Sequence, residues 1–418
     1  MQEVHVFTSA AFNYIPKVRM LFKSLRQHHP EWNLHLALAD ELRAEIDLSN
    51  EPFDGIIPIS ELGIPEWRGW AFCHTIVELA TAIKPFTLAK LLKLPNASKV
   101  IYLDPDTVAF SRLDDILEAL DESNIVLTPH QITPEKTLAA IMDNEICSLK
   151  HGIYNLGFFA VSATNVGHEF ADWWSQRLYY FCREDFQHGL FTDQRWIDLV
   201  PAFFDGVAIM RSPRHNVAPW NLTTREVSFD RAGNYLVDGE ALGFYHFTGF
   251  DSGAHRLMAA KNAGGNKAIG KLIEWYVKQT DQLASDPLAS EPWAFACFSD
   301  GTLIEKVQRL VYRERVDLQK NYPDPFDASG YLAWWESRGK IEYPDFFEPA
   351  GHADAMQKFT KVLTPGFRSG ENNVGWKVIA GLLKQSLVSP VTGVRLGKRG
   401  WEVLKTEGLK GIRRRLLS

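Results

Sequence analysis

Two aspartates separated by one proline are the residues of this sequence whose types and spacing are best suited to chemistry. They follow an apolar, β-branched and aromatic run, residues 100–103, which predicts a buried strand ending at Asp104. Because side chains alternate along extended backbone, Asp104 and Asp106 point the same way, and Pro105 restricts the backbone between them. Two carboxylates at a strand end suit Mg²⁺ or Mn²⁺ bound together with a substrate diphosphate. Asp-Pro-Asp is also ordinary turn chemistry, so the pattern alone leaves both interpretations open.

A histidine at the end of a later predicted strand could complete such a site. Residues 242–247 form an apolar run, and His246 stands directly before the Thr248-Gly249 turn, where a third ligand would have to stand. An isolated histidine is more often a satisfied core residue. Asn155 precedes another apolar strand, at a glycine-containing loop where backbone could approach a ligand closely.

Two other polar positions have a structural interpretation that the residues alone favour. Lys84 stands at the junction of two predicted helices within residues 72–94, where a solvated helix-end cation is more common than a phosphate contact. Asp193 directly precedes the apolar helix that begins near Gln194, and aspartate is a preferred N-cap.

The elements that position these residues follow the pattern of a parallel α/β sheet. Residues 3–8 and 33–38 predict strands, and residues 15–28 predict the helix between them. Ligands of such sheets bind at loops beyond the carboxyl ends of the strands, and residues 8–14 form such a loop. Further along, residues 53–59 predict a strand and residues 63–70 an irregular, pocket-lining loop that contains Trp67.

Composition describes a globular protein with a large core. The 418 residues are 45% hydrophobic, which suggests roughly two to three domains. No run of about 18 apolar residues occurs, and residues 1–5 do not resemble a signal peptide, so we expect a cytoplasmic protein. The four cysteines are scattered, as expected of reduced thiols rather than of a disulfide framework or a zinc site.

Charge is unevenly distributed along the chain. The formal net charge is −6, yet residues 395–418 hold eight Lys or Arg against two Glu, so residues 1–394 carry −12. This acidic body argues against a nucleic-acid partner. The basic tail has apolar residues at helical spacing (Trp401, Leu404, Gly408, Ile412 and Leu416), so it would either pack on the body or lie on an anionic membrane surface.

Taken in order, these motifs resemble those of the GT-A glycosyltransferases with an Asp-x-Asp motif, nearest to family 8 and to bacterial enzymes of surface-polysaccharide synthesis. The resemblance covers about residues 1–335. It rests on Thr8-Ser9, Asn13-Tyr14, Lys84-Pro85, Tyr102-Leu-Asp104-Pro-Asp106, Asn155-Leu-Gly157, Asp193-Gln194, Trp220-Asn221 and His246-Phe-Thr-Gly249. One departure is that Phe250-Asp-Ser-Gly follows where family 8 has a diphosphate-holding Lys-Pro-Trp, and Arg256 or Lys261 could substitute for that lysine.

The resemblance implies an α/β fold of GT-A type, a Rossmann-like mixed sheet flanked by helices, with a mostly helical C-terminal extension. It implies transfer of a sugar from a nucleotide-diphosphate donor, expected to be a UDP-sugar, to a saccharide or lipid-linked glycan, with retention. Asp104, Asp106 and His246 would hold Mn²⁺ or Mg²⁺. Thr8, Ser9, Tyr14, Lys84, Asp104 and Gly249 would contact the donor, and Asn155, Asp193 and Gln194 would act at its sugar.

On this basis we expect four regions. They are a catalytic domain over residues 1–255, a helical extension over 256–340, a linker over 341–372 and the basic amphipathic tail over 373–418. The tail would place a cytoplasmic enzyme on the inner face of the cytoplasmic membrane.

Two other functions stay open on the residues. A sugar-nucleotide nucleotidyltransferase would carry a glycine-rich, basic loop after its first strand, and residues 8–14 contain no glycine, lysine or arginine. A non-catalytic saccharide-binding or scaffold protein would use its 13 tryptophans and basic tail for adhesion, and the paired aspartates would then be a turn.

Overall fold

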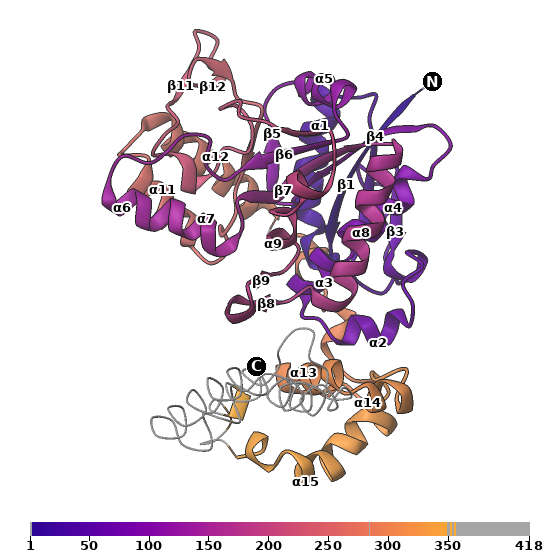
Figure 1. Ribbon diagram of the computed structural model, residues 1–418. Helices are drawn as coiled ribbons and strands as arrows, with labels where there is room; N and C mark the ends of the chain where they lie inside the picture. Colours follow the sequence, from indigo (N-terminus) through magenta and orange to yellow (C-terminus); the bar gives the residue numbers. More distant parts are fainter. Residues whose placement is uncertain (1, 284, 349–351, 353–354, 357–418) are drawn as a thin grey trace, which may run out of the picture. The chain divides into compact units, whose positions relative to one another are not determined.

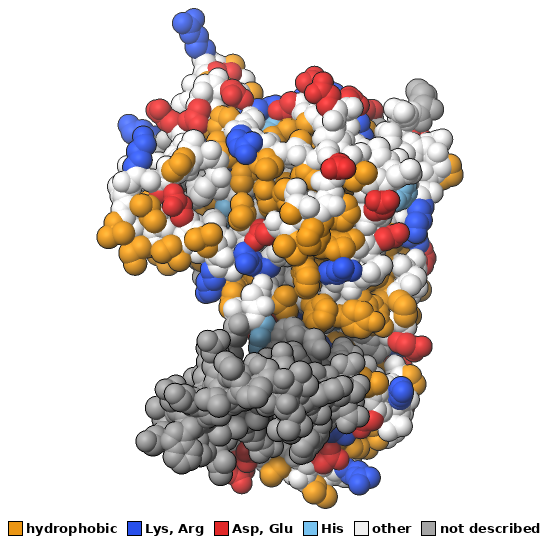
Figure 2. Space-filling model, viewed as in Figure 1, with side chains coloured by type: hydrophobic (Ala, Val, Ile, Leu, Met, Phe, Trp, Pro, Cys, Tyr) orange, Lys and Arg blue, Asp and Glu red, His pale blue; other side chains and the backbone are white. Residues whose placement is uncertain are grey.

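The computed structural model describes residues 2–283, 285–348, 352 and 355–356 (Figure 1). The described residues up to Phe347 form one compact unit, whose side chains Figure 2 shows by type on one face. The predicted tail and most of the predicted linker lie outside the described residues, so the apolar stripe of the tail stays a prediction. Among the described helices, none combines the length and the apolar character that crossing a membrane requires.

A seven-stranded mixed sheet is the centre of the first unit, as the sequence predicts for an α/β fold (Figure 1). Its strands pair in parallel except β7, which runs antiparallel to both β4 and β6. The start of β7 therefore meets the carboxyl end of β4. In sheet order the strands are β10 (Val207–Ile209), β6 (Ile125–Pro129), β7 (Tyr154–Ser162), β4 (Ala97–Leu103), β1 (Glu3–Ala10), β2 (Asn33–Leu38) and β3 (Gly55–Pro58).

Helices cover both faces of this sheet because its central strands are apolar on both sides. Helix α1 (Ile15–His28) and α5 (Asp114–Glu122) pack on the face that carries Val6, Ile101 and Phe158. The opposite face carries Phe7, Tyr102 and Phe159, whose rings lie within 5.0–6.0 Å of one another. Helix α8 (Asn165–Phe181) covers that face through Trp174, which contacts Phe159, and α8 packs beside α4 (Lys84–Leu92).

A separate two-stranded sheet brings the predicted metal ligands together. Strand β5 (Thr107–Ala109), which follows Asp106, pairs antiparallel with β14 (Phe244–His246). In this register His246 lies opposite Thr107, one residue after Asp106. Residues 140 positions apart in the sequence are thus neighbours because of one short strand pair.

The break predicted at Lys84-Pro85 is confirmed, since α3 (Ile76–Ala82) ends there and α4 begins. The irregular loop predicted for residues 63–70 is wrong in its second half, because Trp67–Phe72 form helix α2. Packing explains the difference. The ring of Phe72 is fully buried against Tyr312 and Phe326, at centroid distances of 5.1 and 5.2 Å. Those partners lie about 240–250 residues away, so a local pattern does not contain them.

The remaining elements are short strands and helices around this centre. The strands are β8 (Glu184–Asp185), β9 (Leu190–Phe191), β11 (Val227–Phe229), β12 (Tyr235–Val237) and β13 (Glu240–Ala241). The helices are α6 (Leu138–Ala140), α7 (Ile146–His151), α9 (Gln194–Ile197), α10 (Val200–Phe203), α11 (Ala254–Asn262), α12 (Lys267–Leu283), α13 (Lys306–Glu314), α14 (Val316–Asn321) and α15 (Lys340–Glu342).

Candidate functional site

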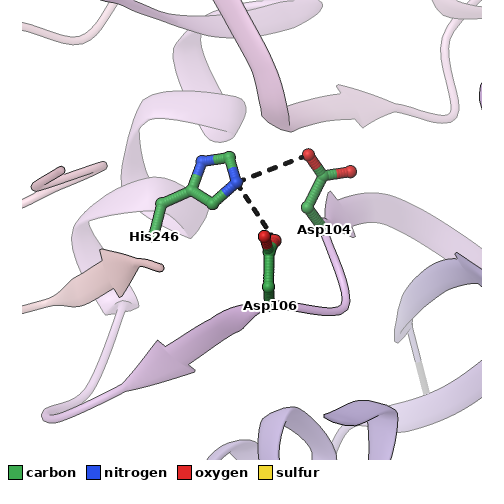
Figure 3. Close-up of side chains that lie close together, drawn as sticks. All are labelled: Asp104, Asp106 and His246. Atoms are coloured by element: carbon green, nitrogen blue, oxygen red, sulfur yellow. Dashed lines mark ion pairs between the residues drawn. The ribbon is translucent and has the colours of Figure 1, made fainter. Parts of the chain in front are cut away.

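Asp104, Asp106 and His246 converge at the end of β4 (Figure 3). One potential ligand atom from each lies within 4.8 Å of the others. The Nε2 atom of His246 is 3.1 Å from an oxygen of Asp106 and 3.6 Å from an oxygen of Asp104. Two carboxylate oxygens and one imidazole nitrogen form a donor set that could hold a divalent ion, although they do not distinguish Mg²⁺ from Mn²⁺.

The imidazole is oriented by an amide behind it. The side-chain oxygen of Asn155 accepts hydrogen bonds from the backbone N–H of Gly157 and from the amide of Asn216, both at 3.1 Å. Because this oxygen can only accept, the Nδ1 of His246, 3.2 Å away, must donate to it. Nε2 is then left to face the two carboxylates, as a metal-ligating histidine requires.

Gly157 makes room for this arrangement. A Cβ atom at this position would lie 2.6 Å from His246 Nδ1 and 2.8 Å from the side-chain oxygen of Asn155, closer than real Cβ contacts. The glycine in the Asn-Leu-Gly motif is therefore needed by the imidazole that packs against β7. The sequence predicted a loop at Asn155 and Gly157, and this is wrong, because the strand already begins at Tyr154 and both residues lie within it.

Opposite charges hold the three side chains together. Burial alone would lower the pKa of His246, but Asp106 and Asp104 outweigh this effect and raise it. Burial alone would raise the pKa of Asp106, but the facing imidazole and Lys17 lower it. A divalent cation would take over the role of the charged imidazole, so the residues fit such an ion.

Lys84 is not the solvated cation that the sequence favoured. Its side chain is 3% exposed, with Nζ 2.8 Å from Asp193 and 3.4 Å from Asp104. It also donates to the Leu156 carbonyl at 3.0 Å. Burial alone would lower the pKa of Lys84, but the two carboxylates raise it well above its ordinary value, so the amine stays charged. The prediction of a solvated cation fails because Lys84 is the first residue of α4, and α4 directs its side chain beneath the end of β4.

Asp193 does not cap the helix that follows it, so the N-cap role that the sequence favoured for this residue is wrong. It occupies the N-cap position of α9, but its side chain makes no capping hydrogen bond and pairs with Lys84 instead. The preceding residue, Thr192, has a φ of +43°, a conformation that is costly for a β-branched side chain. Burial raises the pKa of Asp193, and Lys84 offsets this only in part.

Gln194 lies beside this pair with its amide engaged by backbone. Its side-chain oxygen accepts from the N–H of Leu156 and its NH₂ donates to the carbonyl of His151, both at 3.0 Å. The amide is therefore oriented in advance, and its oxygen keeps one lone pair for a further partner.

Two cavities meet at these residues. The smaller, of about 300 Å³, is lined by the predicted residues Ser9, Tyr14, Lys84, Asp104 and Asp106. The larger, of about 540 Å³, is lined by Asn155, Asp193, Gln194 and His246, and it shares Lys84 and Asp104 with the smaller. Thr8 and Gly249 line neither cavity. Thr8 is fully buried, and Gly249 is a turn residue with a φ of +67°.

Sequence reasoning missed the role of Tyr102. Its hydroxyl lies 3.1 Å from Ser9 and donates to Asp104 at 2.5 Å, and its ring stands under the ammonium group of Lys84 at 4.4 Å. In the sequence the tyrosine was visible as one aromatic of a buried strand and as the first residue of the Tyr102-Leu-Asp104-Pro-Asp106 motif, without a role of its own. Its alternation with Asp104 along β4 is the signal that could have identified it, since both side chains lie on the same face.

Comparisons with known proteins give distant relatives. No model of a protein family matches the sequence. YfnD, an uncharacterised protein of Bacillus subtilis (strain 168), is 26% identical over 255 residues, which cover 60% of this chain and 79% of YfnD.

Among solved structures, the galactosyltransferase LgtC with donor and acceptor sugar analogues is 16% identical, with a TM-score of 0.41. The match covers 68% of this chain and 97% of LgtC. A glycosyltransferase involved in glycosylation of the major capsid of PBCV-1 is 10% identical, with a TM-score of 0.35, over 61% of this chain and 98% of the other. Because these scores are below 0.5, the likenesses carry no functional argument.

Proposed function

We propose that the protein is a metal-dependent glycosyltransferase of GT-A type that moves a sugar from a nucleoside-diphosphate donor to a saccharide or lipid-linked glycan. The observation that carries the proposal is the position of the Asp104, Asp106 and His246 cluster. Its members line the walls of two cavities that share Lys84 and Asp104. A substrate with a diphosphate between two larger parts would extend into both.

The smaller cavity suits the nucleoside. Its wall combines Ser9 and Asn13 with the ring of Tyr14 and small apolar residues of α3. Polar groups would bind base and ribose edges, while the ring and alkyl surfaces would cover the flat face of a base. We propose a UDP-sugar because a pyrimidine fits this volume more readily than a purine.

The larger cavity suits the donor sugar and the acceptor. Its deep end carries the pre-oriented amide of Gln194 and the Lys84–Asp193 pair. Its lining also includes Asn144, Ser148 and Trp220, a combination of hydrogen-bonding groups and one aromatic face that suits a saccharide.

The residues suggest how the reaction is promoted. When the bond between the sugar and the diphosphate breaks, negative charge grows on the leaving oxygens and positive charge grows on the ring. A divalent ion held by Asp104, Asp106 and His246 would stabilise the leaving oxygens by charge. The remaining lone pair of Gln194 would face the positive ring. Asp193 is paired with Lys84, which makes it a poor nucleophile, so retention would proceed by attack on the same face of the sugar rather than through a covalent intermediate on Asp193.

The same proposal covers the domain organisation, the location and the partners of the protein. We assign catalysis to residues 1–255, a helical extension packed on this domain to 256–340, and a linker to 341–372. The basic segment 373–418 would hold a cytoplasmic enzyme against an anionic inner membrane surface, beside a lipid-linked acceptor of surface-polysaccharide synthesis. No nucleic-acid partner is expected, because residues 1–394 are acidic.

Thermal unfolding with a panel of UDP-, GDP- and dTDP-sugars, each with Mn²⁺ or EDTA, tests the proposal. A ligand at 100 times its Kd adds about 2.7 kcal/mol to the unfolding free energy. We expect a rise in Tm with one nucleotide class only when the metal is present. No rise with any donor would favour the non-catalytic saccharide-binding alternative, and a rise that EDTA does not remove would contradict the metal site.

A further inference from the structure

Among the described residues, the wall of the smaller cavity offers no free cation for the leaving diphosphate. Lys84 is the one basic side chain in that wall, and it is engaged by Asp193 and Asp104. The two candidates from the sequence line neither cavity. Arg256 lies over the ring of Phe250 at 5.6 Å, and Lys261 pairs with Asp143.

Lys17 is a better candidate, since it reaches the wall of the smaller cavity. It is the third residue of α1, its side chain is 13% exposed, and its ammonium group donates to the Tyr14 hydroxyl at 3.2 Å. Tyr14 lines the smaller cavity together with Asp106. The charge of Lys17 also acts on the pKa of Asp106, after the effects of burial and of His246.

An anion already occupies this position. The carboxylate of Asp251 pairs with Lys17 and accepts from the Tyr14 hydroxyl at 2.7 Å. Asp251 itself is 59% exposed and follows Phe250 in the turn after β14. The Asp251 carboxylate presents its oxygens to a hydroxyl and to a nearly buried ammonium group. Two oxygens of a phosphate group could bind the same two donors in the same way.

A third donor, without a partner, points to the same place. Tyr276 of α12 is 1% exposed, and its hydroxyl has no hydrogen-bond partner among the described residues. Its ring stacks on Phe247 at 3.7 Å, so it is held rigidly. The ring of Tyr276 also packs against Phe250 at 4.7 Å, and Phe250 directly precedes Asp251, so Tyr276 lies beside the segment that carries this carboxylate. A buried hydroxyl without a partner is unfavourable, and a ligand oxygen that accepts from it would relieve this cost.

We propose that Lys17, with the hydroxyls of Tyr14 and Tyr276, binds the diphosphate of the donor, and that Asp251 is an internal anion that the donor displaces. The inference rests on the proposed function and extends it by assigning the phosphate-binding cation. Asp251 then has two roles: it keeps Lys17 extended while the site is empty, and it lowers affinity for the diphosphate by competing with it.

Calorimetric titration of the full chain with UDP, GDP and dTDP in the presence of Mn²⁺ tests the proposal, with uridine as a probe that lacks phosphates. Lys17→Ala should weaken the best-binding diphosphate at least tenfold and leave uridine unchanged. Asp251→Asn should tighten diphosphate binding several-fold, because the competing charge is gone. Tyr276→Phe should weaken it about threefold without lowering the Tm of the ligand-free protein. Lys23→Ala, an exposed lysine on the same helix, is the matched control and should bind as the wild type does.

Two results would overturn the inference. One is wild-type diphosphate affinity in Lys17→Ala. The other is weaker binding in Asp251→Asn, which would make Asp251 a support of the site rather than a competitor. If the wild type bound none of the three diphosphates, the proposed function would fail together with this site. A wild type that binds one of them while Lys17→Ala is unaffected would remove only the present inference.

Discussion

Substituting Gly157 with alanine should disable the metal site while leaving the fold in place. Gly157 lies within strand β7, and its backbone suits any residue, so alanine adds no backbone strain. The added methyl group would meet the His246 ring, with 2.6 Å to Nδ1, and the Asn155 oxygen at 2.8 Å. Both neighbours are buried side chains that hold each other in place, so neither can yield without breaking their hydrogen bond.

The size of the effect on stability and on metal affinity depends on the side chains that the added methyl group displaces. Overpacking of this kind costs about 1–3 kcal/mol of stability. Turning the imidazole away from the carboxylates removes one ligand and its orienting partner together, a loss that lowers metal affinity about 10–100-fold. We therefore expect a modest fall in Tm and a large fall in Mn²⁺ affinity.

Mn²⁺ binding followed by electron paramagnetic resonance would measure the affinity, and thermal unfolding would measure the stability. Gly270→Ala is the control, because no atom lies within 4 Å of the added carbon and alanine favours helix α12 by about 1 kcal/mol. That variant should bind Mn²⁺ normally and unfold at a slightly higher temperature. Unchanged Mn²⁺ affinity in Gly157→Ala would refute the assignment of His246 as a ligand oriented through Asn155.

Three further predictions concern charge, the sugar site and pH. Lys84→Met should lower the unfolding free energy by about 3–5 kcal/mol, because it leaves the buried Asp193 without its counter-ion, although the Thr192 hydroxyl still donates to it. Adding Asp193→Asn should recover much of this loss in urea unfolding. Equal losses in the single and double variants would contradict the pairing. Gln194→Ala should lower kcat more than it weakens nucleotide binding, because its dipole acts on the charged ring, and a loss confined to binding would exclude that role. Burial lowers the pKa of His74 to about 4. As the pH falls from 6.5 towards 4, this histidine binds a proton in the unfolded chain but not in the folded protein, so the folded protein should lose stability. The pH slope of unfolding should therefore be smaller in His74→Gln, and identical slopes would refute this account.

The individual members of the ligand cluster were predictable because the signals that identify each residue are local. The end of β4 follows from an apolar run that stops at proline, and the common direction of Asp104 and Asp106 follows from strand alternation. His246 was identifiable by its place at a strand end before a turn. The pairing of β5 with β14, which brings the histidine to the aspartates, is a long-range contact that no local pattern contains.

The roles of Lys84 and Asp193 were not predictable from the residues because both positions have an ordinary local explanation. A lysine at a helix junction and an aspartate before a helix are common surface features. Their meeting depends on α4 and α9 converging beneath β4, and only tertiary packing makes burial of the pair possible. Lys17 was missed for a similar reason, since it belongs to the α1 pattern and its partner Asp251 lies 234 residues away.

We propose that the cluster at the end of β4 supports metal-dependent sugar transfer. Transfer of a radiolabelled sugar, measured in one series of variants, tests this proposal most directly. The donor that stabilises the protein would be incubated with a saccharide acceptor, in Mn²⁺ or in EDTA, with wild type, Asp106→Asn and the exposed control Asp121→Asn. We predict transfer by the wild type and by Asp121→Asn in Mn²⁺, none in EDTA, and at least a hundredfold loss in Asp106→Asn at unchanged Tm. Undiminished transfer by Asp106→Asn, or transfer in EDTA, would contradict the account.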